Sequence, residues 1–223
     1  MVLFQDSDQL SNIRIYNMQD CLNSDTPKHI HELKAEKDVI YTKAVWGPKN
    51  ETIIIATQHG KLIQYHIEGA QILAESAVHK GDIFSLDITY DYTMLMTGSR
   101  DGYAKLVNPD DLRVVKEYHY GKPCRSASIS PLFDSDQHQK FHTILAGGQD
   151  ARDVTTTDKE AGGFEMKMFN IILGEKLVEI HGHFGPVHTT SFSPDGCCFA
   201  SGAEDGYVHY HRMPPEYFSK KFE

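Results

Sequence analysis

The sequence has few cysteines and no long apolar segment, and each shortage excludes a class of protein. Four of the 223 residues are Cys, no two have a CxxC spacing, and Cys197 and Cys198 are adjacent. Neither a disulfide framework nor a cysteine zinc site is indicated, and a reduced, cytoplasmic setting is the simplest inference. No apolar segment approaches the roughly 20 residues of a membrane span. Polar residues follow Met1–Phe4 at once, which is unlike a signal peptide.

Basic residues are also scarce, which argues against a surface that binds nucleic acid. The chain has 22 Lys and Arg against 31 Asp and Glu, a formal charge of −9, and the two signs are mixed along the sequence. Binding to a phosphate backbone requires clustered Lys and Arg. Glycine-rich phosphate loops and nucleophile-elbow motifs are missing as well. We therefore expect no cofactor, no enzymatic activity, and no direct sequence-specific binding of nucleic acid.

Two stretches of the chain, 104 residues apart, share one spaced pattern of His, hydroxyl residue and Asp. In each, the hydroxyl residue lies 18 positions after the His and the Asp lies 4 positions further on. The residues are His79, Thr97 and Asp101 in the first stretch, and His183, Ser201 and Asp205 in the second. Self-similarity at a fixed spacing is the signature of a repeat protein.

A catalytic triad and a structural hydrogen-bond relay are the two interpretations of this pattern. Catalytic triads are recognised by geometry and roles rather than by spacing, and one fold does not need two of them. A relay that is repeated once per structural unit is the better interpretation. The pattern resembles that of WD repeats, in which the position six residues after the Asp typically holds Trp; here this position is Val107 in one stretch and His211 in the other. We therefore expect both relays to be incomplete.

Short β-branched and aromatic runs between Gly, Pro, Asn and Asp turns predict an all-β chain of small sheets. Turns near residues 48, 90 and 131 recur at 42 and 41 residues, which fits a WD-repeat β-propeller blade, and the next turn, near 194, follows after 63. The fold class is therefore all-β, an incomplete arc of about four to five blades. The expected divisions are a truncated blade at 1–38, blades at 39–78, 79–120, 121–181 and 182–213, and a tail at 214–223.

The long interval indicates insertions in the third complete blade, at 134–138 and 150–163. Within the second insertion, Thr157 and Glu160 have the spacing of a helix cap, although a solvated loop is the default interpretation. The last blade is expected to lack its fourth strand, because Pro214 and Pro215 interrupt it and proline pairs do not occur inside strands.

Three His-x-His pairs raise a metal-binding alternative. Residues i and i+2 of a strand share a face, so each pair offers two ligands. No third ligand is visible near any pair, and His183 and His211 already occupy relay positions, so no metal site is expected. The pairs are His29/His31, His181/His183 and His209/His211.

Four short sequence motifs give the chain a more specific resemblance than the repeat pattern alone. They are Ala44–Pro48, Gly147–Thr157, Gly182–Pro186 and Glu204–Val208. With these motifs the chain resembles WD-repeat proteins and, within them, the family of subunit i of the eukaryotic translation initiation factor 3 complex. Asp153–Thr157 is specific to that family, whose fold is a seven-bladed propeller, and the resemblance covers about Val39 to Phe218. It implies that the chain is the C-terminal portion of such a ring.

The resemblance implies a non-catalytic scaffold subunit that supports initiation and scanning on the small ribosomal subunit. Its expected partners are subunits b and g of the complex and, indirectly, the small ribosomal subunit, without membrane contact. The acidic balance favours a partner segment rich in Arg or Lys, and the candidate contact residues are Asp110, Asp111, Asp150 and Asp153. The alternative, supported by the fold alone, is a generic WD-repeat adaptor in a signalling complex.

Overall fold

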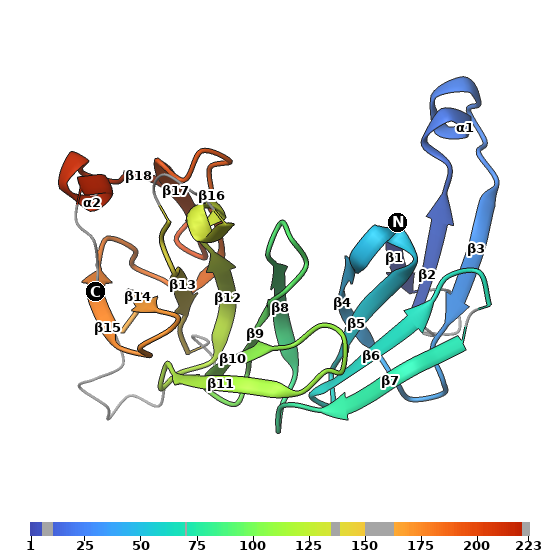
Figure 1. The fold of residues 1–223 in the computed structure, drawn as a ribbon, viewed down its shortest axis with the longest axis horizontal. Helices are drawn as coiled ribbons and strands as arrows, with labels where there is room; N and C mark the ends of the chain where they lie inside the picture. The colour runs from blue at the N-terminus through green and yellow to red at the C-terminus, as the bar shows by residue number, and fades with distance from the viewer. Residues whose placement is uncertain (6–10, 70, 135–138, 150–162, 220–223) are drawn as a thin grey trace. The chain divides into compact units, whose positions relative to one another are not determined.

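The protein is described from a computed structural model, which covers residues 1–5, 11–69, 71–134, 139–149 and 163–219. The described residues form five antiparallel sheets, three of four strands and two of three. In every sheet the strands pair in the order in which they follow one another along the chain (Figure 1). The chain divides into two compact units, Met1–Ile83 and Phe84–Glu223, which we describe separately. The predicted all-β class of small sheets is confirmed.

The first unit holds a three-stranded sheet and a four-stranded sheet. A short helix, α1, lies between the second and third strands, and the side chain of Asn17 caps it by accepting a hydrogen bond from the Gln19 N–H. The strands are β1 (Val2–Gln5), β2 (Ser11–Tyr16), β3 (His29–Lys34), β4 (Tyr41–Trp46), β5 (Thr52–Thr57), β6 (Lys61–His66) and β7 (Gln71–Ala77), and α1 is Met18–Asn23. A 3-10 turn, η1, is Pro48–Asn50.

The second unit holds two four-stranded sheets and one three-stranded sheet; the first strand, β8, starts at the last residue of the first unit. The strands are β8 (Ile83–Ile88), β9 (Leu95–Ser99), β10 (Tyr103–Val107), β11 (Val114–His119), β12 (Cys124–Ile129), β13 (His142–Gly147), β14 (Met166–Asn170), β15 (Lys176–Ile180), β16 (Val187–Phe192), β17 (Cys198–Ala203) and β18 (Val208–Arg212). The 3-10 turn η2 is Pro131–Asp134, and the helix α2 is Pro215–Ser219.

Burial is graded across each four-stranded sheet. The second strands, β9 and β13, are buried along their whole length, whereas the last strands, β11 and β15, are mostly exposed. Burial on both faces is expected of a strand that lies between two other packed layers. In the second unit, residues of β13 and β14 form one apolar cluster with Val187 and Phe199 of the following sheet. Face-to-face packing of successive sheets therefore builds the core.

Polar contacts also join the first strands of the second unit. The Ser85 hydroxyl of β8 accepts a hydrogen bond from the Ala127 N–H of β12 over 3.1 Å. The Ser128 hydroxyl of β12 in turn donates to the Thr190 carbonyl of β16 over 2.7 Å. Buried hydroxyls satisfied in this way fix the first strands of successive sheets against one another.

Among the described residues the last sheet consists of β16, β17 and β18, and the absence of a fourth strand from this blade remains a prediction. After β18 the chain enters α2, which starts at Pro215, a position where proline is well tolerated. The Tyr217 side chain of α2 is buried in the apolar cluster that β13 and β14 form within the second unit. Of the predicted insertions at 134–138 and 150–163, all but their residues 134 and 163 lie outside the described residues, and Thr157 and Glu160 lie outside with them.

Candidate functional site

The second predicted relay brings its three side chains together in the last sheet. His183 Nδ1 lies 2.9 Å from Asp205 Oδ2, and His183 Nε2 lies 2.8 Å from Ser201 Oγ. The Asp205 carboxylate also accepts the backbone N–H of Phe184 and of Tyr207, both over 2.9 Å. These two N–H groups, followed by His183, lower the pKa of Asp205 to about 2. The carboxylate therefore ties the loop before β16 to the turn between β17 and β18.

His211 extends this relay, contrary to the expectation that it would be incomplete. His211 Nε2 lies 3.2 Å from Ser201 Oγ, and its ring is stacked on Phe199 with 4.4 Å between ring centroids. Burial, and then the neighbouring His209 and His183, lower the pKa of His211. The imidazole thus supplies both the flat ring and the hydrogen bond expected of the usual Trp at this position.

The relay has the connectivity of a Ser-His-Asp triad, but its position suits a structural role. Ser201 is 1% exposed, on a strand inside the sheet, so no substrate reaches its hydroxyl. A catalytic serine must present its oxygen to a bound substrate. The arrangement can fix a loop and a turn, and it offers no accessible nucleophile.

The first predicted relay is divided between the two compact units. His79 is buried near the end of the first unit, and Thr97 and Asp101 lie in the second. The Thr97 hydroxyl donates to the Lys105 carbonyl over 3.1 Å, and Asp101 Oδ1 accepts the Tyr103 N–H over 3.1 Å. The contact of His79 with the other two side chains remains a prediction.

Of the four candidate contact carboxylates, the structure describes two. Asp110 and Asp111 are exposed in the turn between β10 and β11. The Asp111 carboxylate accepts the Arg113 N–H over 3.0 Å and lies 3.4 Å from its guanidinium, so this charge is partly engaged within the turn. Asp150 and Asp153 lie outside the described residues.

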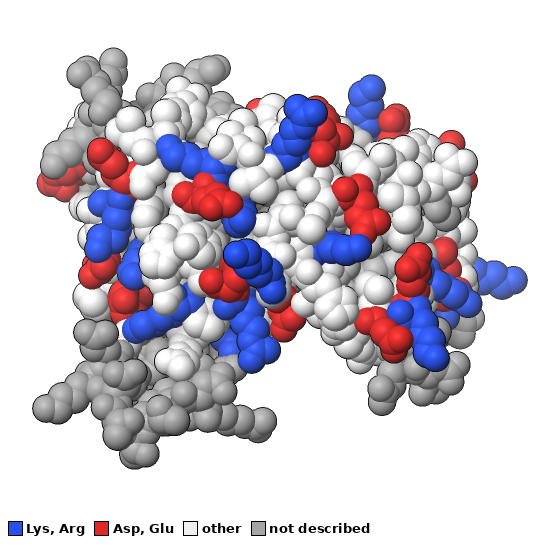
Figure 2. All heavy atoms as spheres, turned by 90° about the horizontal axis from the view of Figure 1, so that it is seen from below, with Lys and Arg blue, Asp and Glu red and all other residues white. Residues whose placement is uncertain are grey.

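An exposed aliphatic surface follows this turn, and sequence reasoning missed it. We call it the β11 patch, after its residues Val114, Val115, Ile172 and Leu173, which are 38%, 56%, 57% and 51% exposed. The Lys116 ammonium of β11 donates to the Ile172 carbonyl, which holds the β14–β15 turn beside β11. Figure 2 shows the molecule from below, with Lys, Arg, Asp and Glu interspersed among neutral side chains. The available signal was three aliphatic residues, Ile171–Leu173, at a turn.

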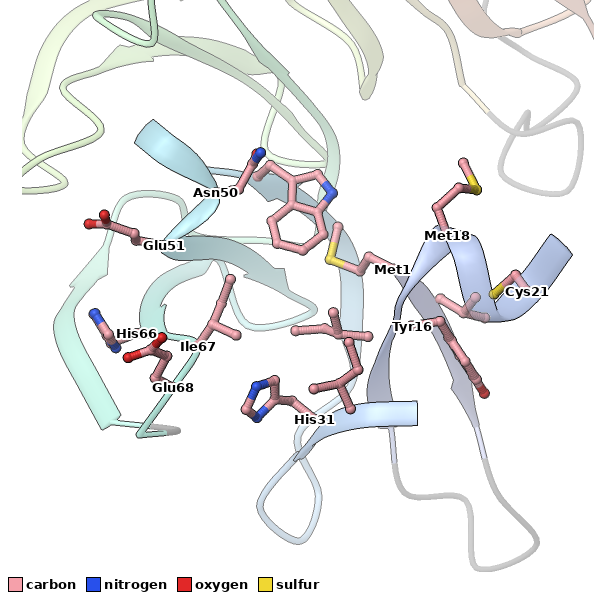
Figure 3. Close-up of a pocket in the computed structure, with 14 residues that line it drawn as sticks. Met1, Tyr16, Met18, Cys21, His31, Asn50, Glu51, His66, Ile67 and Glu68 are labelled. Atoms are coloured by element: carbon pink, nitrogen blue, oxygen red, sulfur yellow. The ribbon is translucent and has the colours of Figure 1, made fainter. Parts of the chain in front are cut away.

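A pocket of about 1010 Å³ lies between the two sheets of the first unit. Apolar side chains, among them Ile15 and Trp46, line it. Glu51, His66 and Glu68 lie on one side, as Figure 3 shows. Trp46, the only Trp of the sequence, both lines this pocket and packs against the apolar core of the first unit. The pocket has no sequence signal, because its lining comes from both sheets.

The described residues contain no group of three or more His, Cys, Asp and Glu side chains placed to hold a metal ion. In the part of the chain that the structure covers, no helix is both long enough and apolar enough to traverse a bilayer. In the last sheet, His183 and His209 are stacked with 4.1 Å between ring centroids. These two rings pack on each other, and His183 is engaged in the relay.

Comparison with known proteins agrees with this architecture. The model of the WD domain, G-beta repeat matches residues 71–108 and 174–211. Each match covers the last strand of one sheet and the next three strands, β7–β10 and β15–β18. Subunit I of eukaryotic translation initiation factor 3 from Rattus norvegicus, Taeniopygia guttata and Homo sapiens is 39% identical over 182 residues.

The chain is a WD-repeat homologue of eukaryotic translation initiation factor 3 subunit I. The similarity covers 82% of this chain and 54% of each of these relatives. The chain therefore spans about half the length of the curated relatives that it matches. The resemblance to subunit I that the four sequence motifs indicated is confirmed.

Proposed function

We propose that the chain is a non-catalytic scaffold subunit of the translation initiation factor 3 complex. In this role it supports initiation and scanning on the small ribosomal subunit, in the cytoplasm, through protein–protein contacts. The observation that carries the proposal is the 39% identity to subunit I over 82% of the chain. The buried position of Ser201, in an arrangement that has the connectivity of a catalytic triad, supports a structural rather than an enzymatic role.

The β11 patch is the surface that best suits docking of another subunit. It places exposed aliphatic side chains beside the turn that holds Asp110 and Asp111. Apolar anchors next to acidic groups fit a partner segment that combines apolar residues with Arg or Lys. We propose subunit b of the complex as its occupant and subunit g as a further partner, with the small ribosomal subunit reached indirectly. Asp150 and Asp153 remain candidate contacts of the same kind.

A binding assay with purified subunit b tests the docking surface. The Val115→Asp/Leu173→Asp variant is expected to weaken binding at least tenfold, because it places two charges in an apolar contact. Asp110→Lys/Asp111→Lys is expected to weaken binding at low salt, and the difference from the parent is expected to shrink as salt rises. Asp150→Lys/Asp153→Lys, assayed in the same way, tests the two remaining candidates.

A matched control uses the same position of another sheet. Leu73 of β7 is 53% exposed and Val115 is 56% exposed, and both are the extra residue of a β-bulge in the last strand of a sheet. Leu73→Asp should leave subunit b binding unchanged. If both the control and the patch variant bind as the parent does, the β11 patch is not the docking site. If the parent binds neither subunit b nor subunit g and is recovered with receptors or kinases, the signalling adaptor replaces the translation proposal.

A further inference from the structure

The pocket between the two sheets of the first unit has the size and the lining of a small-molecule site. Its volume of about 1010 Å³ lies at the upper end of the roughly 300–1,000 Å³ that such sites occupy. Most of the fourteen residues that line it are apolar or aromatic, and the polar ones include Glu51, His66 and Glu68. An apolar pocket into which a few polar groups converge is the usual form of a ligand site.

Two turns of the β4–β7 sheet hold the carboxylates on one side of this pocket. The Ile67 N–H donates to the Glu51 carbonyl over 3.0 Å, which fixes the turn after β6 against the turn after β4. Glu51 and Glu68 therefore lie on the same side, as Figure 3 shows. Among the described residues neither carboxylate belongs to an ion pair, and no Lys or Arg side chain lines the pocket.

The opposite side of the pocket is apolar and comes from the β1–β3 sheet and α1. Ile30, the extra residue of a β-bulge in β3, lines the pocket and is 54% exposed. Met18 and Cys21 of α1 line it as well, and Figure 3 shows them across from the carboxylates. Helix α1 buries none of its residues, so it can shift toward a ligand without breaking a packed core contact.

An apolar surface that faces two carboxylates suits a ligand with an apolar body and one positive charge. The apolar body gains free energy when it covers exposed side chains such as Ile30 and Met18. An ammonium group forms charge-assisted hydrogen bonds with carboxylates, and an indole ring such as that of Trp46 also attracts a cation. An anion of the same shape would be repelled by Glu51 and Glu68.

We propose that this pocket binds a small organic cation, an amine on an aliphatic or aromatic body. The body packs against Ile30 and Trp46, and the ammonium group faces Glu51 and Glu68. Ligand binding of this kind is separate from the scaffold contacts, because the pocket belongs to the first unit, whereas the β11 patch and the His183 relay belong to the second.

Trp46 is the only Trp of the sequence, so the tryptophan fluorescence of the full chain reports on this pocket. The probe is phenylbutylamine, and the comparison compound is phenylbutyrate, which carries the opposite charge on a similar body. Titration with the amine is expected to shift the emission of Trp46 to shorter wavelength and to saturate, because the bound probe displaces water from the indole. Phenylbutyrate is expected to bind about tenfold more weakly.

Removal of the two carboxylates tests the charged side of the pocket. One exposed ion pair changes an affinity about 1.4- to 5-fold, so Glu51→Gln/Glu68→Gln is expected to weaken binding of phenylbutylamine about 2- to 25-fold. Glu36→Gln/Asp38→Asn is the matched control, because it removes two exposed carboxylates from the same unit without changing the lining. The control is expected to leave the affinity for the amine unchanged.

Charge reversal tests the apolar side of the pocket. When Ile30→Lys is added to Glu51→Gln/Glu68→Gln, the preference is expected to reverse, so that phenylbutyrate binds more tightly than phenylbutylamine. Ile72→Lys in the same background is the control, because Ile72 is 50% exposed, belongs to the other sheet and does not line this pocket. Thermal melts check that all variants are folded.

Three outcomes would overturn the proposal. The first is a Trp46 emission that does not respond to phenylbutylamine, or that responds equally to phenylbutyrate. The second is a folded Glu51→Gln/Glu68→Gln variant that binds the amine as tightly as the parent. The third is an end-capped Leu-Arg-Leu peptide that binds where the amine does not, which would assign the pocket to side chains of a partner protein. Failure of subunit b to bind the β11 patch would leave the present proposal standing, because the two surfaces share no residue.

Discussion

His142 Nδ1 on β13 lies 2.8 Å from the Tyr217 hydroxyl on α2, although 75 residues separate them. Both side chains are buried, and the two rings are in contact with 5.3 Å between their centroids. Burial, and then the nearby Lys140, lower the pKa of His142 to about 4, and burial raises the pKa of Tyr217 to about 12. The helix that ends the described chain is therefore fixed to an inner strand through two neutral groups.

The lowered pKa of His142 predicts acid sensitivity. An unfolded His titrates near pH 6.5, so between about pH 6.5 and 4 the unfolded chain binds more protons than the folded one. The free energy of unfolding contributed by this group therefore falls as the pH falls through that window. Denaturant unfolding at several pH values should show the decrease in the parent and in Tyr217→Phe, and a smaller one in His142→Leu. An equal decrease in His142→Leu would rule out His142 as its source.

Asp205 predicts a second pH window, at more acidic values. Its pKa is lowered to about 2 in the folded chain, and an unfolded Asp titrates near 3.9. The stability that it contributes is present above about pH 4 and is lost as the pH falls toward 2. Asp205→Asn should be less stable than the parent at pH 7, and the difference should shrink toward pH 2. A constant difference across this range would contradict the assignment of the charge to the relay.

Ser201 tests the relay without changing a charge. Ser201→Ala removes the hydroxyl that lies between His183 and His211 and leaves the buried His183 ring and the partly buried His211 ring each short of a partner. The expected loss of unfolding free energy is about 1–3 kcal/mol, measured by chemical denaturation. Ser191 on β16 is exposed, so Ser191→Ala is the control and should stay within about 0.5 kcal/mol of the parent. Equal unfolding free energies of the two variants would show that the relay does not contribute to stability.

Gly147 tests the close approach of two strands. A Cβ at this position would lie 2.0 Å from the Pro123 carbonyl oxygen and 2.9 Å from the Arg125 nitrogen, both of them backbone atoms. Gly147→Ala must therefore displace the backbone, and we expect a destabilisation of about 1–3 kcal/mol. Gly202→Ala, with only a Thr189 methyl at 3.4 Å, is the control and should have a much smaller effect on the melting temperature. A Gly147→Ala variant with the same melting temperature as the parent would show that the backbone of this strand pair shifts at little cost in free energy.

Much of the fold could be predicted because its signals are local. Strands such as β8 and β16 coincide with short β-branched and aromatic runs that turn residues flank. Pro214 and Pro215 cannot lie inside a ladder, and among the described residues β18 is followed by helix α2 rather than by a strand. Helix α1 was not predicted, because its six residues bury no apolar face and the Asn17 cap was its only local signal.

The candidate site, too, was predictable only where its signals are local. The spacing of His183, Ser201 and Asp205 predicted that they would act together, since the repeat copied the spacing along with the fold. The part played by His211 was missed, because the identity of the residue at the Trp position does not reveal that an imidazole can reach Ser201.

The sequence by itself determined the all-β class, the repeat and the relationship to subunit I, because these rest on residue types at short, fixed spacings. Only the tertiary structure decided that Glu117 faces Lys105, that β18 pairs only with β17 among the described residues, and that Lys116 of β11 reaches the turn at Ile172. Those relationships depend on strand register and on packing between segments tens of residues apart. A shift of one residue in register moves every side chain to the other face of its sheet, and no local pattern records that choice.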